Sequence, residues 1–188
     1  MQPGGTSANM LRRINIFGAA GTGTSTIGRA LATSLGIPHV EADDCFWLPT
    51  DPPFQQMRPP AELQAMLDAT LDPQAPWVLS GSIAGWGDPI VPMLDLAVFL
   101  WVPPAIRLAR LLARERERHG DAALAPGGAM HDGFRLFMSW AAAYDRAGLE
   151  LRSRKVHELW MRALPCPLLR LEGTPSIEEA LAQIAQYR

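Results

Sequence analysis

Short apolar runs alternate along this chain with longer segments of helical period, and this alternation restricts the fold more than any other feature of the sequence. Five segments have the length of buried strands: residues 14–17, 38–41, 77–79, 96–102 and 168–171. Segments with a helical pattern lie between and after them, at residues 25–35, 62–71, 105–118, 131–147, 154–163 and from Ser176 onward. Strands joined by helices pair in parallel, so the pattern predicts an α/β domain with one sheet covered by helices on both faces. A chain of 188 residues is long enough for one such domain.

The strongest chemical signal lies directly between the first strand and the first helix. It is a glycine-rich turn, made of Gly18, Ala19, Ala20, Gly21, Thr22, Gly23, Thr24, Ser25 and Thr26. Glycine lets the backbone wrap closely, so that its amides face an anion, and the N-terminus of the following helix adds the positive end of its dipole. The turn therefore predicts a phosphate-binding loop, with ATP as its ligand.

One position of this loop departs from the expected pattern G-x-x-x-x-G-K-[ST]. Ser25 occupies the place of the hydroxyl that ligates Mg²⁺, but Thr24 stands where the pattern has lysine. The missing ammonium removes positive charge from the transition state of phosphoryl transfer, so another cation must supply it or the protein is slow. A nucleotide-binding regulatory protein without turnover is therefore the alternative to an enzyme.

A dinucleotide-binding fingerprint is a further alternative for the same turn. That fingerprint reads G-x-G-x-x-G, and an acidic residue follows it about 20 positions later. The frame that starts at Gly21 places Thr26 where the third glycine belongs, although Asp43 lies at a suitable distance. The mononucleotide interpretation fits the residues better.

The helix expected at residues 105–118 has two different faces. Its apolar face carries Leu108, Leu111 and Leu112. Arginines recur every three or four positions on another face, at Arg107, Arg110, Arg114 and Arg118. Such a face is either a phosphate-binding surface or a solvated face paired with Glu115 and Glu117.

The loop, the Asp43-Asp44 pair and the arginine-bearing helix together resemble those of the adenylate-kinase-like and shikimate-kinase-like P-loop kinases. The resemblance extends from Arg13 to the last helix and is nearest to the uncharacterised branch beside the DNA topology-modulation proteins. It implies a three-layer fold with the strand order 2-3-1-4-5, an acceptor site over strands two and three, and a lid at about residues 105–150. The implied activity is transfer of the γ-phosphoryl group of ATP, with Mg²⁺, to a small acceptor.

The resemblance also assigns roles to charged residues of this chain. Asp43 and Asp44 follow strand two, where shikimate-type kinases place carboxylates that hold the acceptor or a Mg²⁺-bound water. Asp44 is slightly favoured as the group that accepts the hydroxyl proton, and Asp43 as an acceptor-binding residue. Arg110 and Arg114 are the lid arginines expected to replace the missing lysine.

Three further residues are candidates for the acceptor site. Arg58 precedes the helix that follows strand two and could bind an anion. Ser82 follows strand three, and Trp86 could flank a ring, although packing explains a tryptophan equally well. The four histidines show no ligand spacing and are expected to serve structure or surface.

Composition excludes some partners. The formal net charge is −2 and the pI is near 6.1, so no basic excess indicates double-stranded nucleic acid as a ligand. No apolar run approaches the roughly 20 residues of a membrane helix, and residues 1–13 lack the apolar core of a signal peptide. The two cysteines, Cys45 and Cys166, fit neither a zinc site nor a disulfide scaffold. The sequence therefore predicts a cytoplasmic protein with a small-molecule partner.

Overall fold

Five parallel strands form one sheet in the order β2-β3-β1-β4-β5, as predicted. The computed structural model describes residues 11–187. The strands are β1 (Arg13–Gly18), β2 (His39–Glu41), β3 (Trp77–Ser80), β4 (Leu96–Trp101) and β5 (Leu168–Glu172). Their order places the carboxyl ends of β1, β2 and β3 side by side, and this edge of the sheet carries the candidate site.

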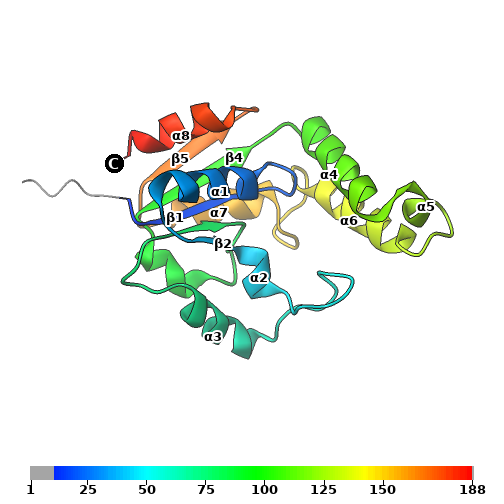
Figure 1. Ribbon diagram of the computed structural model, residues 1–188, viewed down its shortest axis with the longest axis horizontal. Coiled ribbons are helices and arrows are strands. Elements are labelled where there is room, and N and C mark those ends of the chain that lie inside the picture. Colours follow the sequence, from blue (N-terminus) through cyan, green and yellow to red (C-terminus); the bar gives the residue numbers. More distant parts are fainter. Residues whose placement is uncertain (1–10, 188) are drawn as a thin grey trace, which may run out of the picture.

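Helices lie on both faces of the sheet, and three of them extend beyond it (Figure 1). They are α1 (Thr24–Leu35), α2 (Ala42–Phe46), α3 (Pro60–Thr70), the 3₁₀ helix η1 (Asp88–Met93), α4 (Pro104–His119), α5 (Asp121–Leu124), α6 (His131–Ala143), α7 (Arg154–Arg162) and α8 (Ile177–Ala185). The three that extend outward are α4, α5 and α6 (Figure 1). They occupy most of the expected lid segment.

Local sequence signals explain several helix ends. Gly36 ends α1 in the left-handed region, at φ 67°, and the Ile37 amide donates to the Ala32 carbonyl at 3.1 Å. Pro104 is the first residue of α4, where its missing N–H costs nothing. Ser176 and Glu179 form the predicted reciprocal cap of α8.

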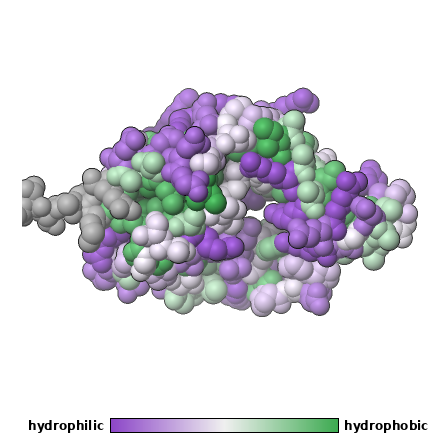
Figure 2. All heavy atoms as spheres, turned by 45° about the horizontal axis from the view of Figure 1, so that its top comes forward, coloured by the Kyte–Doolittle hydropathy of each residue, from purple (hydrophilic) through white to green (hydrophobic). Residues whose placement is uncertain are grey.

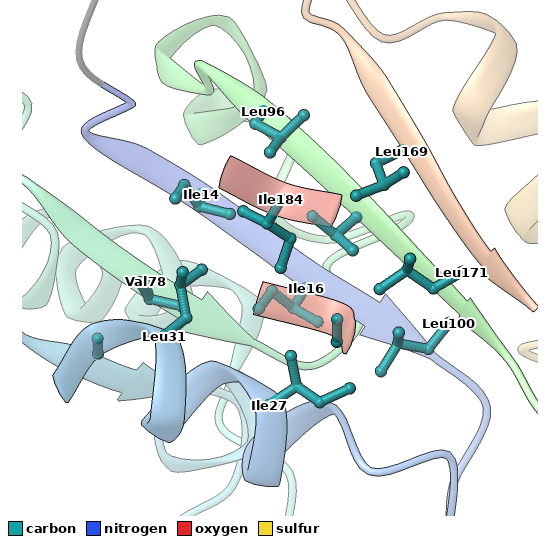
Figure 3. Close-up of a cluster of buried hydrophobic side chains, with 13 residues drawn as sticks. Ile14, Ile16, Ile27, Leu31, Val78, Leu96, Leu100, Leu169, Leu171 and Ile184 are labelled. Carbon is teal, nitrogen blue, oxygen red and sulfur yellow. The ribbon is translucent and has the colours of Figure 1, made fainter. Parts of the chain in front are cut away.

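The core follows the two-residue period of the strands. Ile14 and Ile16 of β1 point to the face covered by α1 and α8, where they meet Ile27, Leu31 and Ile184 (Figure 3). Phe17, the residue after Ile16, points to the other face and packs with Phe99 and Met161. Two apolar layers therefore hold the sheet between its helices.

The structure corrects the expected face of α4. Leu111 is buried, as expected, together with Arg107 and Glu115 four residues to either side, whereas Leu108 and Leu112 are only partly buried. Arg107 has no solvent exposure because its guanidinium is enclosed by carbonyl groups and by Asp145. A periodicity that counts arginine as polar cannot find a buried arginine.

Smaller details follow the strands and helices. Asp43 and Asp44, which follow β2, lie within the first turn of a short helix, α2. The segment expected as a loop after α4 contains α5, and α6 ends at Ala143 rather than at residue 147.

Between residues 11 and 187, no helix combines the length and the hydropathy needed to cross a membrane. The expectation for the opening segment concerns mainly residues 1–10, which lie outside the described residues.

Candidate active site

The glycine-rich turn between β1 and α1 wraps as tightly as the sequence predicts. Gly21 and Gly23 have φ angles of 81° and 99°, a region that favours glycine. A Cβ at Gly18 would lie 2.5 Å from the Leu100 carbonyl oxygen, and one at Gly21 would lie 2.7 Å from that of Arg107. Both positions therefore exclude a side chain, and the loop packs directly against β4 and α4.

The amides at the start of α1 are open to a ligand. Within the loop the Thr22 amide donates to the Ala19 carbonyl at 3.3 Å, and the Thr22 hydroxyl does so at 2.8 Å. The first amide of α1 bonded to a carbonyl behind it is that of Ile27, which donates to Gly23 at 3.0 Å. Among the described residues, the amides from Gly23 to Thr26 have no protein acceptor. These free donors fit a chain of phosphate oxygens.

Arginines of α4 hold the carbonyl side of the same loop. Arg107 donates from Nη1 to the Ala20 oxygen at 3.3 Å, and Arg110 donates from Nη1 to the Thr22 oxygen at 3.3 Å. The same Arg110 nitrogen would be 4.0 Å from a Cβ at Gly23, next to Thr24. A positive charge therefore lies beside the position where the sequence pattern lacks its lysine.

A carboxylate that the sequence analysis missed accepts a hydrogen bond from Ser25. The Ser25 hydroxyl donates to Glu41 Oε2 at 2.8 Å, and Arg29 approaches the other oxygen at 3.3 Å. Glu41 is the last residue of β2, and β2 runs parallel to β3, so its carboxylate reaches the carboxyl edge of the sheet. Its position at the end of the second strand is the sequence feature that could have identified Glu41 as a site residue.

Ser25 and Glu41 provide the oxygen ligands that Mg²⁺ prefers. In the part of the chain from residue 11 to 187, no group of three or more His, Cys, Asp or Glu residues is placed to hold a metal ion. This small donor set suits Mg²⁺, which commonly takes one or two carboxylates and completes its shell with water and phosphate oxygens.

Asp43 is subject to opposing influences on its pKa. Its side chain reaches solvent, yet surrounding protein desolvates the carboxylate and raises its pKa. Asp44 raises this pKa further, whereas Arg152 and Arg114 act in the opposite direction. Figure 2 shows an open hollow near the middle of the molecule. Charges from three separate parts of the chain therefore act on one carboxylate.

Arg152 is the second residue that the sequence analysis missed. It lies between α6 and α7, and its guanidinium carbon is 4.8 Å from the centroid of the Trp140 ring. Burial lowers its pKa, and the charge of Asp43 opposes that effect. Within residues 11–187 its guanidinium has no hydrogen-bond or ion-pair partner. A half-buried arginine with free donors fits an anionic ligand.

Arg114 fits both interpretations of the arginine face of α4, as a residue paired with a glutamate and as one that acts on the candidate site. Its guanidinium donates to Glu115 Oε1 at 3.0 Å and lies 5.8 Å from the Phe137 ring centroid. Its charge also acts on Asp43. The structure thus brings Arg110 to the loop and places Arg114 toward the carboxylate pair.

The remaining predicted acceptor residues are engaged within the protein. Arg58 donates to the Cys45 oxygen at 2.9 Å and to the Trp47 oxygen at 3.4 Å, so its donors fasten the proline-rich segment to α2 rather than stand free for an anion. Trp86 donates from Nε1 to the Ser82 carbonyl at 3.0 Å and packs against an apolar cluster. Ser82 is buried, and its hydroxyl lies 2.8 Å from His157 Nε2.

Two solved structures share this fold. The shikimate kinase from Bacteroides thetaiotaomicron has a TM-score of 0.54 at 17% identity, covering 94% of this chain and 98% of that one. The shikimate kinase from Acinetobacter baumannii, solved in complex with shikimate, has a TM-score of 0.52 at 17% identity, covering 94% and 92%. The sheet order 2-3-1-4-5 is the one these kinases led us to expect, and it differs from the dinucleotide-binding order 3-2-1-4-5-6.

Sequence comparison gives relatives at two levels. No protein-family model matches the chain. Cytidylate kinase from Archaeoglobus fulgidus is 27% identical over 114 residues, which cover 55% of this chain and 62% of that protein. The uncharacterized protein YqaC from Bacillus subtilis is 42% identical over 178 residues, which cover 95% of this chain and 98% of that protein. The chain therefore belongs to the same family as YqaC, and it has the fold of the small-molecule P-loop kinases.

Proposed function

We propose that this protein is an ATP-dependent kinase that transfers the γ-phosphoryl group to a small acceptor carrying both a hydroxyl and an anionic group. The observation that carries the proposal is the loop itself: its amides from Gly23 to Thr26 have no acceptor among the described residues, and Arg107 and Arg110 bond to its carbonyls. The similarity to cytidylate kinase supports the reaction class.

The donor side is formed by the loop and by α4. The amides of residues 18–26 bind the phosphate oxygens, and Arg110 supplies the charge that Thr24 lacks. Ser25 and Glu41 hold Mg²⁺, which neutralises charge on the phosphate oxygens when it is bound. In this arrangement, α4 takes over part of the role that the loop lysine has in other members of the fold.

The acceptor side is formed by Asp43, Asp44, Arg152 and Arg114. Arg152 binds the anionic group of the acceptor, because its donors have no partner within residues 11–187 and the Trp140 ring packs against its guanidinium. We favour Asp43 over Asp44 as the group that receives the hydroxyl proton. Desolvation raises the pKa of Asp43 and makes its carboxylate a stronger base.

The reaction balances with these groups alone on the protein side. A bond forms between the acceptor oxygen and the γ-phosphorus, the bond from that phosphorus to the bridging oxygen of ADP breaks, and the acceptor proton passes to Asp43. Catalysis rests on positioning and on charge, and no covalent intermediate on the protein is needed.

A transfer assay tests the proposal. The protein is incubated with γ-labelled ATP, Mg²⁺ and panels of hydroxy acids, sugar acids, sugar phosphates and nucleoside monophosphates. We expect label in at least one anionic, hydroxyl-bearing acceptor. Arg152→Ala then raises the KM for that acceptor about tenfold or more and leaves the KM for ATP unchanged. Arg162→Ala, an exposed arginine in the last turn of α7, is the matched control.

The same assay distinguishes a kinase from the alternative suggested by Thr24, a nucleotide-binding regulatory protein without turnover. Tight binding of ATP without transfer to any member of the panels would identify a nucleotide-binding protein that does not turn over. The finer placement beside the DNA topology-modulation proteins, the single-domain organisation with a lid at residues 105–150, and the cytoplasmic location remain predictions.

A further inference from the structure

Three buried polar side chains form a linear chain beside the proposed acceptor site. The Tyr144 hydroxyl lies 2.7 Å from His157 Nδ1, and the Ser82 hydroxyl lies 2.8 Å from His157 Nε2. All three residues are at most 4% exposed. This hydrogen-bonded chain of side chains connects the end of α6, the first half of α7 and the loop after β3.

The imidazole in the middle of this chain is uncharged. The rings of Phe17 and Phe99 lie with their centroids 5.3 Å and 6.0 Å from it, so burial lowers the pKa of His157 to about 3. The positive charge of Arg152 acts in the same direction. A neutral imidazole has one nitrogen that donates and one that accepts, and the tautomer decides which is which.

Counting hydrogens shows that one hydroxyl must point out of the chain. Tyr144, His157 and Ser82 carry one polar hydrogen each, while the chain contains only two hydrogen bonds. If Nδ1 carries the imidazole hydrogen, Ser82 donates to Nε2 and the Tyr144 hydrogen is left over. If Nε2 carries it, Tyr144 donates to Nδ1 and the Ser82 hydrogen is left over.

The chemistry of the two hydroxyls favours the second arrangement. A phenol is a stronger hydrogen-bond donor and a weaker acceptor than an aliphatic hydroxyl, because its ring withdraws electron density from the oxygen. The imidazole nitrogen with a lone pair therefore takes its bond from Tyr144, and the serine oxygen accepts from Nε2.

The free end of the chain lies at the proposed acceptor site. Ser82 follows the carboxyl end of β3, between the phosphate loop after β1 and Asp43 after β2. Its neighbour Gly81 is packed so closely that a Cβ there would lie 2.8 Å from that of Ala42. The charge of Arg152 acts on both Asp43 and His157, so this guanidinium lies near both the carboxylate and the hydrogen-bonded chain.

We propose that Tyr144 holds His157 in the tautomer with hydrogen on Nε2, so that Ser82 donates its hydroxyl hydrogen to an anionic oxygen of the acceptor beside Arg152. Ser82 is then a specificity-determining residue, and His157 and Tyr144 are positioning residues that act through it. The inference rests on the proposed function for the identity of the ligand, but the tautomer does not depend on it.

Long-range ¹H–¹⁵N correlation spectra of the ¹⁵N-labelled free protein test the tautomer. His39→Gln, His119→Gln and His131→Gln assign the other three imidazoles, so the buried His157 need not be replaced. We expect the Nε2–H pattern for His157 in the wild type and a mixture of both tautomers in Tyr144→Phe, which removes only the hydroxyl. An Nδ1–H pattern in the wild type, or an unchanged pattern in Tyr144→Phe, would overturn the proposal.

Inorganic phosphate is the probe for the ligand, followed at the Hε1 signal of His157 because this proton reports the acceptor end rather than the loop. We expect Ser82→Ala to weaken binding about tenfold, and Tyr144→Phe to weaken it by a smaller factor. Ser34→Ala, a partly exposed serine of α1, is the control and leaves the affinity unchanged. Equal affinity in Ser82→Ala and the wild type, or no response of this signal to phosphate, would remove the donor role of Ser82.

These outcomes are separable from failure of the kinase assay. If the tautomer is Nε2–H and the phosphate response depends on Ser82, but no acceptor in any panel is labelled, the proposed function is contradicted and the role of Tyr144, His157 and Ser82 is not. If label is transferred without these two responses, only the proposed role of these three residues is contradicted.

Discussion

At the scale of single residues, Ser25 connects the loop to the end of β2. Its hydroxyl donates to Glu41, and the same oxygen would be a ligand of Mg²⁺ in the proposed complex. Ser25→Ala removes one ligand of the ion and leaves the Glu41 carboxylate without this partner. We expect Mg²⁺-dependent ATP binding to weaken by about ten- to a hundredfold, the range for a bond to a charged group.

Titration calorimetry with and without Mg²⁺ measures this change. Ser34→Ala, in the same helix, is the control because its hydroxyl bonds only to the Leu31 carbonyl of its own turn. Unchanged affinity in Ser25→Ala would show that the nucleotide or the ion binds elsewhere.

Arg110 is the residue on which catalysis without a loop lysine depends. Its guanidinium already lies on the loop, where it donates to the Thr22 carbonyl at 3.3 Å. We expect Arg110→Ala to lower kcat by about a hundredfold, a typical cost of removing one group that stabilises transition-state charge. Arg110→Lys should restore part of the activity, since it returns the charge but not the planar fork.

Steady-state kinetics with the acceptor found in the panels measure this effect. Arg116→Ala, in the same helix but paired with Asp121 at 2.9 Å on the outer surface, is the control. If Arg110→Ala retained full kcat, the charge would have to come from Arg114 or from another cation.

At the scale of elements, α4 is fastened to the sheet edge through Arg107. This buried guanidinium donates to carbonyls of Val102, Ala20 and Ala141 and pairs with Asp145. It therefore ties together the end of β4, the phosphate loop and α6. Arg107→Leu leaves the Asp145 carboxylate without its ion-pair partner, with only the bond from Trp101 Nε1, and removes the Arg107 donors from these carbonyls, so we expect a loss of about 3 kcal/mol of unfolding free energy.

Urea denaturation at pH 7 measures this loss. Arg116→Leu is the matched control on α4, and we expect a change below about 1 kcal/mol because its ion pair is exposed. Similar stability of both variants would mean that the Arg107 contacts make no net contribution and that apolar packing positions α4.

The elements that the sequence predicted share one property, namely that local residues determine them. The alternation of strands and helices, Gly36 at the end of α1, Pro104 at the start of α4 and the cap made by Ser176 are all visible without tertiary contacts. The glycine-rich loop belongs to the same class, because its conformation depends on its own φ angles.

The site residues that were missed are defined by contacts between distant parts of the chain. Glu41 reaches Ser25 only because β2 ends beside α1, and Arg152 is one of many arginines until the fold half-buries it without a partner. His157 could not be recognised from spacing, because its partners Ser82 and Tyr144 lie 75 and 13 positions away. Sequence periodicity carries no information on such pairings.

At the scale of the whole molecule, the buried neutral imidazole of His157 makes stability depend on pH. Its pKa is lowered to about 3 by burial in the folded protein, whereas the unfolded chain binds a proton near the ordinary value of 6.5. Below pH 6.5 the unfolded state therefore holds more protons than the folded state, and stability falls as pH falls. The pKa of His39 is lowered by burial as well, so this residue contributes with the same sign.

Between pH 7 and pH 5 we expect these two histidines to outweigh Asp43, whose raised pKa acts with the opposite sign as pH falls. The carboxyl groups with lowered pKa values, Asp95 and Glu158, lose their contribution only at lower pH. We expect the unfolding free energy to fall by about 2 kcal/mol over this range from His157 alone. Urea denaturation at several pH values measures the slope. His39→Gln should keep most of the slope and His157→Gln should flatten it, whatever its effect on stability at pH 7. Equal unfolding free energies of the wild type at pH 7 and pH 5 would contradict the lowered pKa of His157 and, with it, a neutral imidazole between Ser82 and Tyr144.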